Sequence, residues 1–270
     1  AYTSTKGYAL IDRRLFVPEK WFGQEYEERR KKCKMPQDLV FKKKPELANE
    51  MIQEVCKSGL FSFRWVTCDT IFGNSPEFLQ NLPEHIFCLA EIAKNRKVWI
   101  KPEESRDRKK RPSVSVSDIA RDEKVAWKLT KLAEGAKGPI LGFVSRVRVY
   151  VDEPVKAETE RWLFLRKDAT TEEIKYYFSN APLDTSLEEM TRVCSLRWPI
   201  EQSFQEGKSE LGMADYEHRS WPAWHRHMTF VFLAQLFLLR IQYVFKKNAS
   251  FNITPSTDVA GSRLTSYPIR

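Results

Sequence analysis

The stretch from Arg197 to Lys208 constrains the fold most, because it places a line of polar side chains beside an apolar stripe. Pro199 suits the first turn of a helix, where its missing N–H costs no hydrogen bond, so we predict a helix over about 199–212. With successive residues about 100° apart, four polar residues fall within about 40° of one line: Arg197, Glu201, Gln205 and Lys208. Three apolar residues form the adjoining stripe: Ile200, Phe204 and Leu211. We therefore expect a half-buried helix with Glu201 at the edge of its buried face, while Glu206 and Glu210 point elsewhere.

Two interpretations of this helix remain open at this point. Arg197 and Glu201 are four residues apart, and such pairs are often surface salt bridges that contribute about 0.3 kcal/mol. Alternatively, a carboxylate flanked by an arginine and a lysine on a half-buried helix is what a metal-dependent phosphoryl-transfer site needs.

A second acidic residue, Asp69, stands where many α/β proteins bind ligands. Residues 61–68 are rich in β-branched and aromatic side chains and predict a strand, which ends at Asp69. Gly73 and the Ser75–Pro76 pair then mark a loop and the start of another helix. Ligands of α/β proteins lie outside the carboxyl ends of the strands. An aspartate in this place also caps turns frequently, so the position alone does not decide its role.

The composition fits one large soluble domain or two smaller ones, with a basic surface. The chain has 270 residues, 42% of them hydrophobic, and a net charge of +9. The basic residues gather in three runs: 29–34, 42–44 and 106–111. Clustered positive charge favours a polyanionic partner such as DNA, because each neutralised phosphate releases counterions. Solvated faces of an ordinary basic protein explain the runs as well.

The cysteine and histidine patterns favour the reducing cytoplasm and indicate no metal site of their own. The five cysteines are odd in number and contain no Cys-x-x-Cys pair, so neither a disulfide framework nor a zinc site is expected. The histidines lack metal-ligand spacing, and we interpret them as phosphate-facing or surface residues: His85, His218, His225 and His227. The sequence also shows no Ser/His/Asp or glycine-loop signal of an unrelated hydrolase.

The apolar run from Met228 to Phe245 is long enough to suggest a membrane span, but its polar residues argue against one. Two polar lines follow the helix: Gln235 with Gln242 and Lys246, and Arg226 with Thr229 and Arg240. We therefore predict a long amphipathic helix packed on a core, and no contact with a membrane.

The order of the expected elements divides the chain into four parts. Residues 1–101 hold strands over 7–17, 61–68, 85–91 and 97–101 and helices over 20–34 and 44–58. Residues 102–182 hold a polar linker over 102–122, a short helix near 123–133 and β-rich segments over 140–151, 161–166 and 174–178. Residues 183–247 are helical, with helices over 186–198, 199–212 and 221–247, and residues 248–270 form a flexible tail.

Two motifs carry a resemblance to a known family. Asp69-Thr70-Ile71-Phe72-Gly73 resembles the Asp-x-x-[Tyr/Phe]-Gly motif around the second catalytic Asp of DDE-superfamily insertion-sequence transposases. Arg197, Glu201 and Lys208 match the spacing of the Arg, Glu and Lys in the Tyr-Arg-Glu-Lys signature of such transposases. Further similar segments are 15–21, 41–48 and 216–227, so that the resemblance covers most of residues 6–245.

The resemblance implies an α/β fold with an RNase H-like core, in which residues 1–101 and 183–247 are the two parts of the catalytic core. It implies that the β-rich residues 102–182 are an inserted subdomain between the second Asp and the Glu. Three carboxylates of such a core hold two divalent metal ions, Mg²⁺ by preference with Mn²⁺ as a substitute. By this resemblance Asp69 and Glu201 would be metal ligands, and Arg197 and Lys208 would contact DNA phosphate.

The implied partners are double-stranded DNA, at transposon ends and target, and a second copy of the chain when paired ends are bound. The implied location is the bacterial cytoplasm, in association with the nucleoid. Trp162 of the β-rich block is a weak candidate for stacking on a displaced base.

The sequence departs from the family pattern at two places. The signature Tyr, three residues before the Arg, falls on Cys194, so a phenol contact to phosphate is absent or made by another group. The first catalytic Asp of the family lies upstream of the segment at 15–21, and the chain begins at Ala1, too late to contain it. Asp12 lies beside that segment and is not a substitute.

We therefore expect a catalytic region of a transposase, incomplete at its N-terminus and with little or no strand-transfer activity by itself. The alternative is a non-catalytic DNA-binding transposase remnant or repressor that acts through its basic surface.

Overall fold

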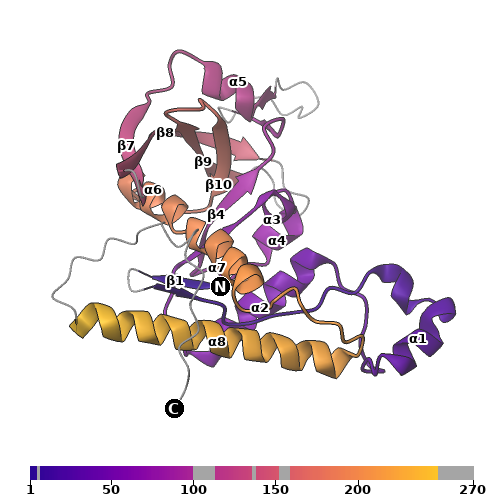
Figure 1. Cartoon of the computed structure of the whole chain (residues 1–270). Coiled ribbons are helices and arrows are strands. Elements are labelled where there is room, and N and C mark those ends of the chain that lie inside the picture. Colours follow the sequence, from indigo (N-terminus) through magenta and orange to yellow (C-terminus); the bar gives the residue numbers. More distant parts are fainter. Residues whose placement is uncertain (5–6, 100–112, 136–137, 152–158, 249–270) are drawn as a thin grey trace.

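The computed structural model describes residues 1–4, 7–99, 113–135, 138–151 and 159–248 (Figure 1). A curled six-stranded sheet runs through it, in the order β3-β4-β10-β9-β8-β7. Its strands are β3 (Trp65–Cys68), β4 (Phe87–Ile92), β10 (Ile174–Ser179), β9 (Thr159–Asp168), β8 (Gly138–Val151) and β7 (Lys128–Gly135). β3 and β4 are parallel, and the other neighbours in this sheet are antiparallel. This mixed α/β architecture confirms the predicted class and is compatible with an RNase H-like core.

The β-rich block continues the sheet that begins with β3 and β4. Strands β8, β9 and β10 form at the segments predicted for them. β10 pairs with β4, with Tyr177 opposite Glu91, so hydrogen bonds join the block directly to the strands near Asp69. The division of the chain at residues 102 and 182 stays a prediction. The basic run at 106–111 and the tail beyond 248 lie outside the described residues.

The helix predicted near 123–133 is wrong. Residues Lys128–Gly135 form β7, and the short helix of this region comes earlier, as α5 (Val116–Arg121). β7 pairs along β8, and Leu132 is buried in the core. Pairing with a long neighbouring strand and burial of Leu132 therefore outweighed the helix propensity of the Lys, Leu and Ala residues, which is a weak preference that tertiary context overrides.

The N-terminal region is less regular than predicted. Of the strand expected over 7–17, only β2 (Gly7–Ala9) forms, and it pairs with β1 (Tyr2–Ser4). Farther along, Arg13 donates a hydrogen bond of 2.9 Å to the carbonyl of His225, a contact that ties this segment to a helix instead of a strand. The expected helix over 20–34 is three short ones: η1 (Glu19–Phe22), η2 (Gln24–Tyr26) and α1 (Glu27–Lys32). β5 (Lys97–Val98) pairs with β6 (Val114–Ser115) in a separate two-stranded sheet.

Helices cover both faces of the sheet at β3 and β4. α2 (Lys44–Ser58) forms as predicted, with Pro45 in its first turn and Gly59 in the left-handed conformation after its end. Together with α3 (Thr70–Gly73) and α4 (Pro76–Gln80) it packs on one face, around Phe78 and Cys88. α6 (Leu187–Ser195) packs on the opposite face, around Leu89 and Tyr177. The sheet near Asp69 is therefore covered by α2, α3 and α4 on one face and by α6 on the other.

The long helix α8 (Trp221–Asn248) forms, but one residue of its predicted polar line is buried against the fold. Gln235 is 5% exposed, and its side-chain amide donates to the carbonyl of Ser203 at 3.3 Å. Many apolar side chains of α8 face outward instead: Phe230, Leu233, Phe237, Tyr243 and Phe245 are more than half exposed. By length and composition alone this helix could cross a membrane. One side of it nevertheless packs on the fold, through Met228 and Val231.

Two histidines of α8 are partly buried and have structural contacts, which the interpretation as phosphate-facing or surface residues did not include. His225 lies between Trp221 and Trp224, with 4.8 Å between its ring centroid and each of theirs. His227 hydrogen-bonds the carbonyl of Gly212 through Nε2 at 2.8 Å. Burial lowers the pKa of His225 from its usual 6.5, and the nearby Arg13 and Arg14 lower it further.

The lowered pKa of His225 predicts a pH-dependent stability. In the unfolded chain His225 takes up a proton near pH 6.5, whereas in the folded protein it stays neutral to lower pH. The contribution of His225 to the free energy of unfolding is therefore fully present above pH 6.5 and is lost as the pH falls below that value. Thermal unfolding measures this effect: between about pH 7.5 and about pH 5.5, the Tm of the wild type should fall more than the Tm of His225→Gln. His218→Gln, at an exposed position, should keep the wild-type slope. Equal slopes for the wild type and His225→Gln would contradict this account.

Candidate functional site

Asp69 ends β3 and begins α3, as the sequence predicts for its position. Its Oδ1 accepts a hydrogen bond of 3.0 Å from the backbone N–H of Ile71, and its carbonyl accepts one of 2.9 Å from Gly73. The capping role considered for this residue is therefore real. This capping hydrogen bond uses Oδ1, one of the two carboxylate oxygens of Asp69.

Gly73 explains the spacing of the motif that starts at Asp69. A Cβ placed on Gly73 would lie 1.9 Å from the carbonyl oxygen of Glu91 in β4, a distance that no side chain tolerates. Only glycine lets α3 lie directly on the backbone of β4. The close approach turns the chain sharply after β3 and keeps Asp69 at the edge of the sheet.

The register of the parallel strands brings a further carboxylate to this edge. Cys68 lies beside Ala90, so the next residues, Asp69 and Glu91, are neighbours at the carboxyl ends of β3 and β4. Asp69 keeps an extended backbone, so the alternation of side chains continues through it. Cys68 faces the α2 and α4 side, which places Asp69 and Glu91 on the α6 side of the sheet.

α7 (Trp198–Ser209) brings the predicted arginine and glutamate to the same place. Arg197 donates from Nη1 to Oε1 of Glu201 at 2.9 Å, and its Nη2 lies 3.6 Å from Oε2 of Glu91. The salt bridge expected within the helix thus exists, and the same arginine also reaches the sheet. Burial raises the pKa of the Cys68 thiol, as do the neighbouring Asp69 and Glu91, while Arg197 opposes them.

The polar line of α7 is exposed, where the prediction placed it at the edge of a buried face, and the buried residues differ from the predicted stripe. Glu201, Gln205 and Lys208 all lie on the surface. Phe204, which the prediction placed in the buried stripe, is 45% exposed. The buried residues are Ser203 and Gly207, which are small enough to let α7 approach Gln235 of α8 and the side chain of Met213. Close helix contact favoured small residues over bulky apolar ones at these positions.

Glu206 is occupied by structural contacts. Its Oε1 accepts hydrogen bonds of 2.8 Å from the hydroxyl of Tyr8 and 3.0 Å from the amide of Gln202. The Tyr8 contact joins α7 to β2, and burial together with this carboxylate raises the pKa of the tyrosine. Glu206 thus holds the helix in place.

Cys194 stands at the signature Tyr position and lies in the core. It is 4% exposed, and its thiol is hydrogen-bonded to Tyr177 and Arg166. Burial raises the pKa of Cys194. A phenol therefore does lie beside this position, but Tyr177 comes from β10 and is 2% exposed, so it has no access to a DNA phosphate.

Trp162 has no free face for a base, which corrects its suggested role. It is 9% exposed, its indole N–H donates to the carbonyl of Pro182, and two guanidinium groups lie over its ring. Arg146 and Arg148 lie 4.2 and 4.5 Å from the ring centroid, respectively.

Sequence reasoning missed two residues near the site. Glu91 is an acidic residue within the otherwise apolar strand β4, and an acid in such a strand needs a partner, which was the available signal. Trp198 directly follows Arg197 and is 65% exposed, an unusual setting for an indole and one that suits stacking on a base.

The residues present fit divalent metal ions in kind but not in number. Carboxylate oxygens such as those of Asp69 and Glu201 are hard ligands of the type that Mg²⁺ prefers. Throughout the described ranges, however, no group of three or more His, Cys, Asp or Glu residues is arranged to hold an ion. Glu201 instead pairs with Arg197.

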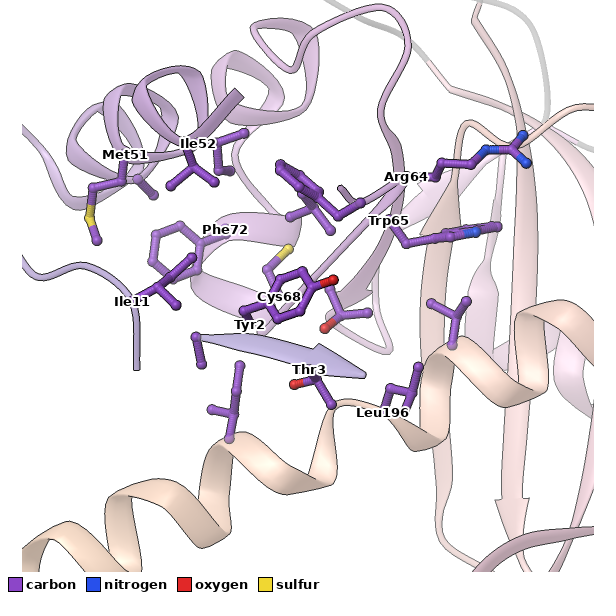
Figure 2. Close-up of a pocket in the computed structure, with 18 of the residues that line it drawn as sticks. Tyr2, Thr3, Ile11, Met51, Ile52, Arg64, Trp65, Cys68, Phe72 and Leu196 are labelled. Atoms are coloured by element: carbon purple, nitrogen blue, oxygen red, sulfur yellow. The ribbon is translucent and has the colours of Figure 1, made fainter. Parts of the chain in front are cut away.

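A cavity of about 610 Å³ adjoins this edge of the sheet (Figure 2). Tyr2 and Thr3 of β1 line it on one side, and residues of β3 from Trp65 to Cys68 line it on the other. Apolar side chains of α2 and of the α6–α7 region complete its walls, among them Met51, Ile52 and Leu196.

Comparison with known proteins identifies a family. A family model described as DDE superfamily endonuclease matches residues 1–139, which include Asp69, Gly73 and Glu91. No curated protein matches the chain. Members of this superfamily generally use divalent metal ions.

The contact of Gly73 with β4 predicts a position-specific loss of stability. Gly73→Ala should lower the free energy of unfolding by about 3 kcal/mol, because a strand backbone cannot move aside. Gly207→Ala is the matched control: its new Cβ would meet Met213 Cε at 2.7 Å, the end of a flexible side chain. We expect that variant to lose about 1 kcal/mol or less in urea unfolding followed by circular dichroism. Similar losses for both variants would contradict the assigned role of Gly73.

Proposed function

Because the chain belongs to the DDE superfamily endonuclease family, we propose that it is the catalytic region of an insertion-sequence transposase that cleaves and transfers DNA strands at the ends of the element. The observation that carries the proposal is the salt bridge of Arg197 with both Glu201 of α7 and Glu91, the residue that follows Ala90 as Asp69 follows Cys68 in the paired strands β4 and β3. Family membership supports a nuclease or transposase type of phosphoryl transfer, and the insertion-sequence role rests on the two sequence motifs.

In this proposal Asp69 and Glu201 are metal ligands, and Arg197 and Lys208 bind DNA phosphate. Arginine offers two parallel N–H donors to a phosphate, and lysine adds a point charge. Lys208 is exposed two turns along α7 from Glu201, on the same side of the helix. We propose Mg²⁺ as the cofactor, two ions in the complete enzyme, with Mn²⁺ as a substitute.

We further propose that the core needs one more carboxylate, because no group of three His, Cys, Asp or Glu residues is arranged to hold an ion within the described ranges. The cavity offers a place for it, because residues of both β1 and β3 line this space. β3 is the terminal strand of the six-stranded sheet, so one of its sides has no strand partner within the described ranges. An extended strand paired with this side of β3 would lie beside Asp69.

The partners proposed are double-stranded DNA and, on paired ends, a second copy of the chain. The location proposed is the bacterial cytoplasm, near the nucleoid, without a membrane role. No disulfide joins the five cysteines, all of which lie within the described residues, and this suits a reducing compartment.

A DNA-binding remnant or repressor remains the second candidate function. The observation that favours it is the pairing of Glu201 with Arg197 together with the lack of a three-carboxylate group in the described part of the chain. Such a protein would bind DNA through Arg197 and Lys208 without cleaving it.

Salt dependence tests the proposed DNA contacts. Arg197→Gln and Lys208→Gln should each lower the slope of log affinity against log salt by about one unit, because each removes one phosphate contact. Fluorescence anisotropy with a labelled duplex measures the slope. Lys128→Gln, an exposed lysine on the opposite edge of the sheet, is the control and should keep the wild-type slope. Unchanged slopes in both site variants would remove Arg197 and Lys208 from the interface.

Nicking of supercoiled plasmid in Mg²⁺ or Mn²⁺ tests the missing carboxylate. Residues 1–270 should show little or no cleavage, because two carboxylates hold two ions weakly. Robust cleavage that is lost in Asp12→Ala would overturn both the incompleteness of the site and the exclusion of Asp12. Adding an upstream strand that carries an aspartate should restore cleavage if the chain is an enzyme, and should leave only binding if it is a repressor.

A further inference from the structure

Glu91 is an acidic residue in a setting where an acid is costly. It lies in β4 between buried residues, its side chain is 17% exposed, and its Oε2 is buried without a hydrogen-bond donor in the described structure. A buried carboxylate oxygen without such a donor costs stability unless a nearby charge compensates it. Two cations approach it: Arg197 Nη2 at 3.6 Å from Oε2, and Lys175 Nζ at 4.0 Å from Oε1.

Arg197 spans two carboxylates that come from different elements. One terminal nitrogen contacts Glu201 of its own helix, and the other faces Glu91 of the sheet. The Glu201 side chain is 52% exposed, whereas the Glu91 side chain is 17% exposed. The contact with Glu201 is a hydrogen bond of 2.9 Å that water and salt screen, whereas the contact with Glu91 is an ion pair at 3.6 Å that they screen less, so both contacts hold the guanidinium. The planar group cannot turn toward either carboxylate without affecting the other contact.

We propose that Glu91 is a positioning residue that anchors Arg197 beside Glu201, so that the guanidinium serves as the internal counter-ion of Glu201 in the DNA-free protein. The inference rests on the proposed function and adds a form of regulation to that site. The positive charge of Arg197 stands where a divalent cation bound to Glu201 would be repelled. Cation uptake therefore requires Arg197 to turn away.

A DNA phosphate is the group that would draw Arg197 away. Phosphate offers the guanidinium two oxygens in place of the single oxygen of Glu201. With Arg197 on a phosphate, Glu201 would be left without its counter-ion and could serve as a carboxylate ligand of a cation, and the phosphate would no longer compete with a like-charged carboxylate. DNA and divalent cation then strengthen each other's binding by the same factor, as linkage requires.

The anchoring step is tested without metal or DNA, by NMR of the arginine guanidinium groups. A guanidinium held on two sides rotates slowly and gives separate Nη signals, so Arg197 of the wild type should show them. Glu91→Gln should collapse them into an averaged signal, and Glu201→Gln should do the same, since each variant weakens one of the two contacts that hold the guanidinium. Glu188→Gln removes the carboxylate of an exposed ion pair with Lys128 and is the control.

Glu91→Asp keeps the charge and serves if Glu91→Gln does not fold; it should retain slowed rotation. Averaged Arg197 signals in the wild type would overturn the anchoring, and so would separate signals that persist in Glu91→Gln.

The counter-ion step is tested by Mn²⁺ binding, followed through the electron paramagnetic resonance signal of the free ion. Arg197→Gln should bind Mn²⁺ about tenfold more tightly than the wild type, because a unit charge a few ångströms away is removed. Arg197→Lys keeps the charge and should stay near the wild type. Adding a duplex should tighten Mn²⁺ binding in the wild type and have less effect in Arg197→Gln.

The outcomes separate this inference from the proposed function. Unchanged affinity in Arg197→Gln, or no binding by any variant at millimolar Mn²⁺, would overturn the counter-ion role. If Arg197→Gln binds tightly but Asp69→Asn and Glu201→Gln bind Mn²⁺ as the wild type does, the proposed metal ligands fail. The NMR result for Glu91 would stand in that case.

Discussion

The contact of Gly73 with the backbone of β4 is the constraint on which the site depends. Because Gly73 has no side chain, α3 lies directly over Glu91, and the chain turns within a few residues of the end of β3. The turn keeps Asp69 at the strand end, and the parallel register puts Glu91 beside it. One missing Cβ thereby determines where two carboxylates stand. A bulkier residue would lift α3 from the sheet and separate Asp69 from the helix that carries Glu201.

Small side chains also determine the position of α7. Ser203 and Gly207 form its buried side, so the helix lies close to α8 and to Met213 while its charged line stays in solvent. Glu206 fixes the helix to β2 through Tyr8, and Arg197 fixes it to β4 through Glu91. These contacts orient Glu201, Gln205 and Lys208 outward, where a polyanion can reach them. Small buried residues and two polar contacts thus hold α7 on the fold, which was expected of a broad apolar stripe.

Local signals predicted a good part of this arrangement. The helix begun by Pro199, the helix from Lys44 to Ser58 closed by Gly59, and Asp69 at the end of a strand all follow from residue chemistry that acts within a few positions. The errors fall where packing against other residues decides. β7 formed because it pairs with β8, the next strand, and buries Leu132, while His225 packs against Trp221 and Trp224 of its own helix. Gln235 turned inward because its amide donates to the carbonyl of Ser203, which lies 32 positions away and which helical periodicity could not reveal.

The sequence by itself determined the spacing of Arg197, Glu201 and Lys208 and the motif from Asp69 to Gly73, because helix geometry and turn chemistry depend on neighbours along the chain. Only the tertiary structure decided that Arg197 is shared between Glu201 and a strand residue more than a hundred positions away. Sheet register and helix packing bring Glu91 to that place, and both depend on contacts across the whole fold. The salt bridge that looked like an ordinary surface pair is therefore part of a larger group of charges that also includes Glu91 and Lys175.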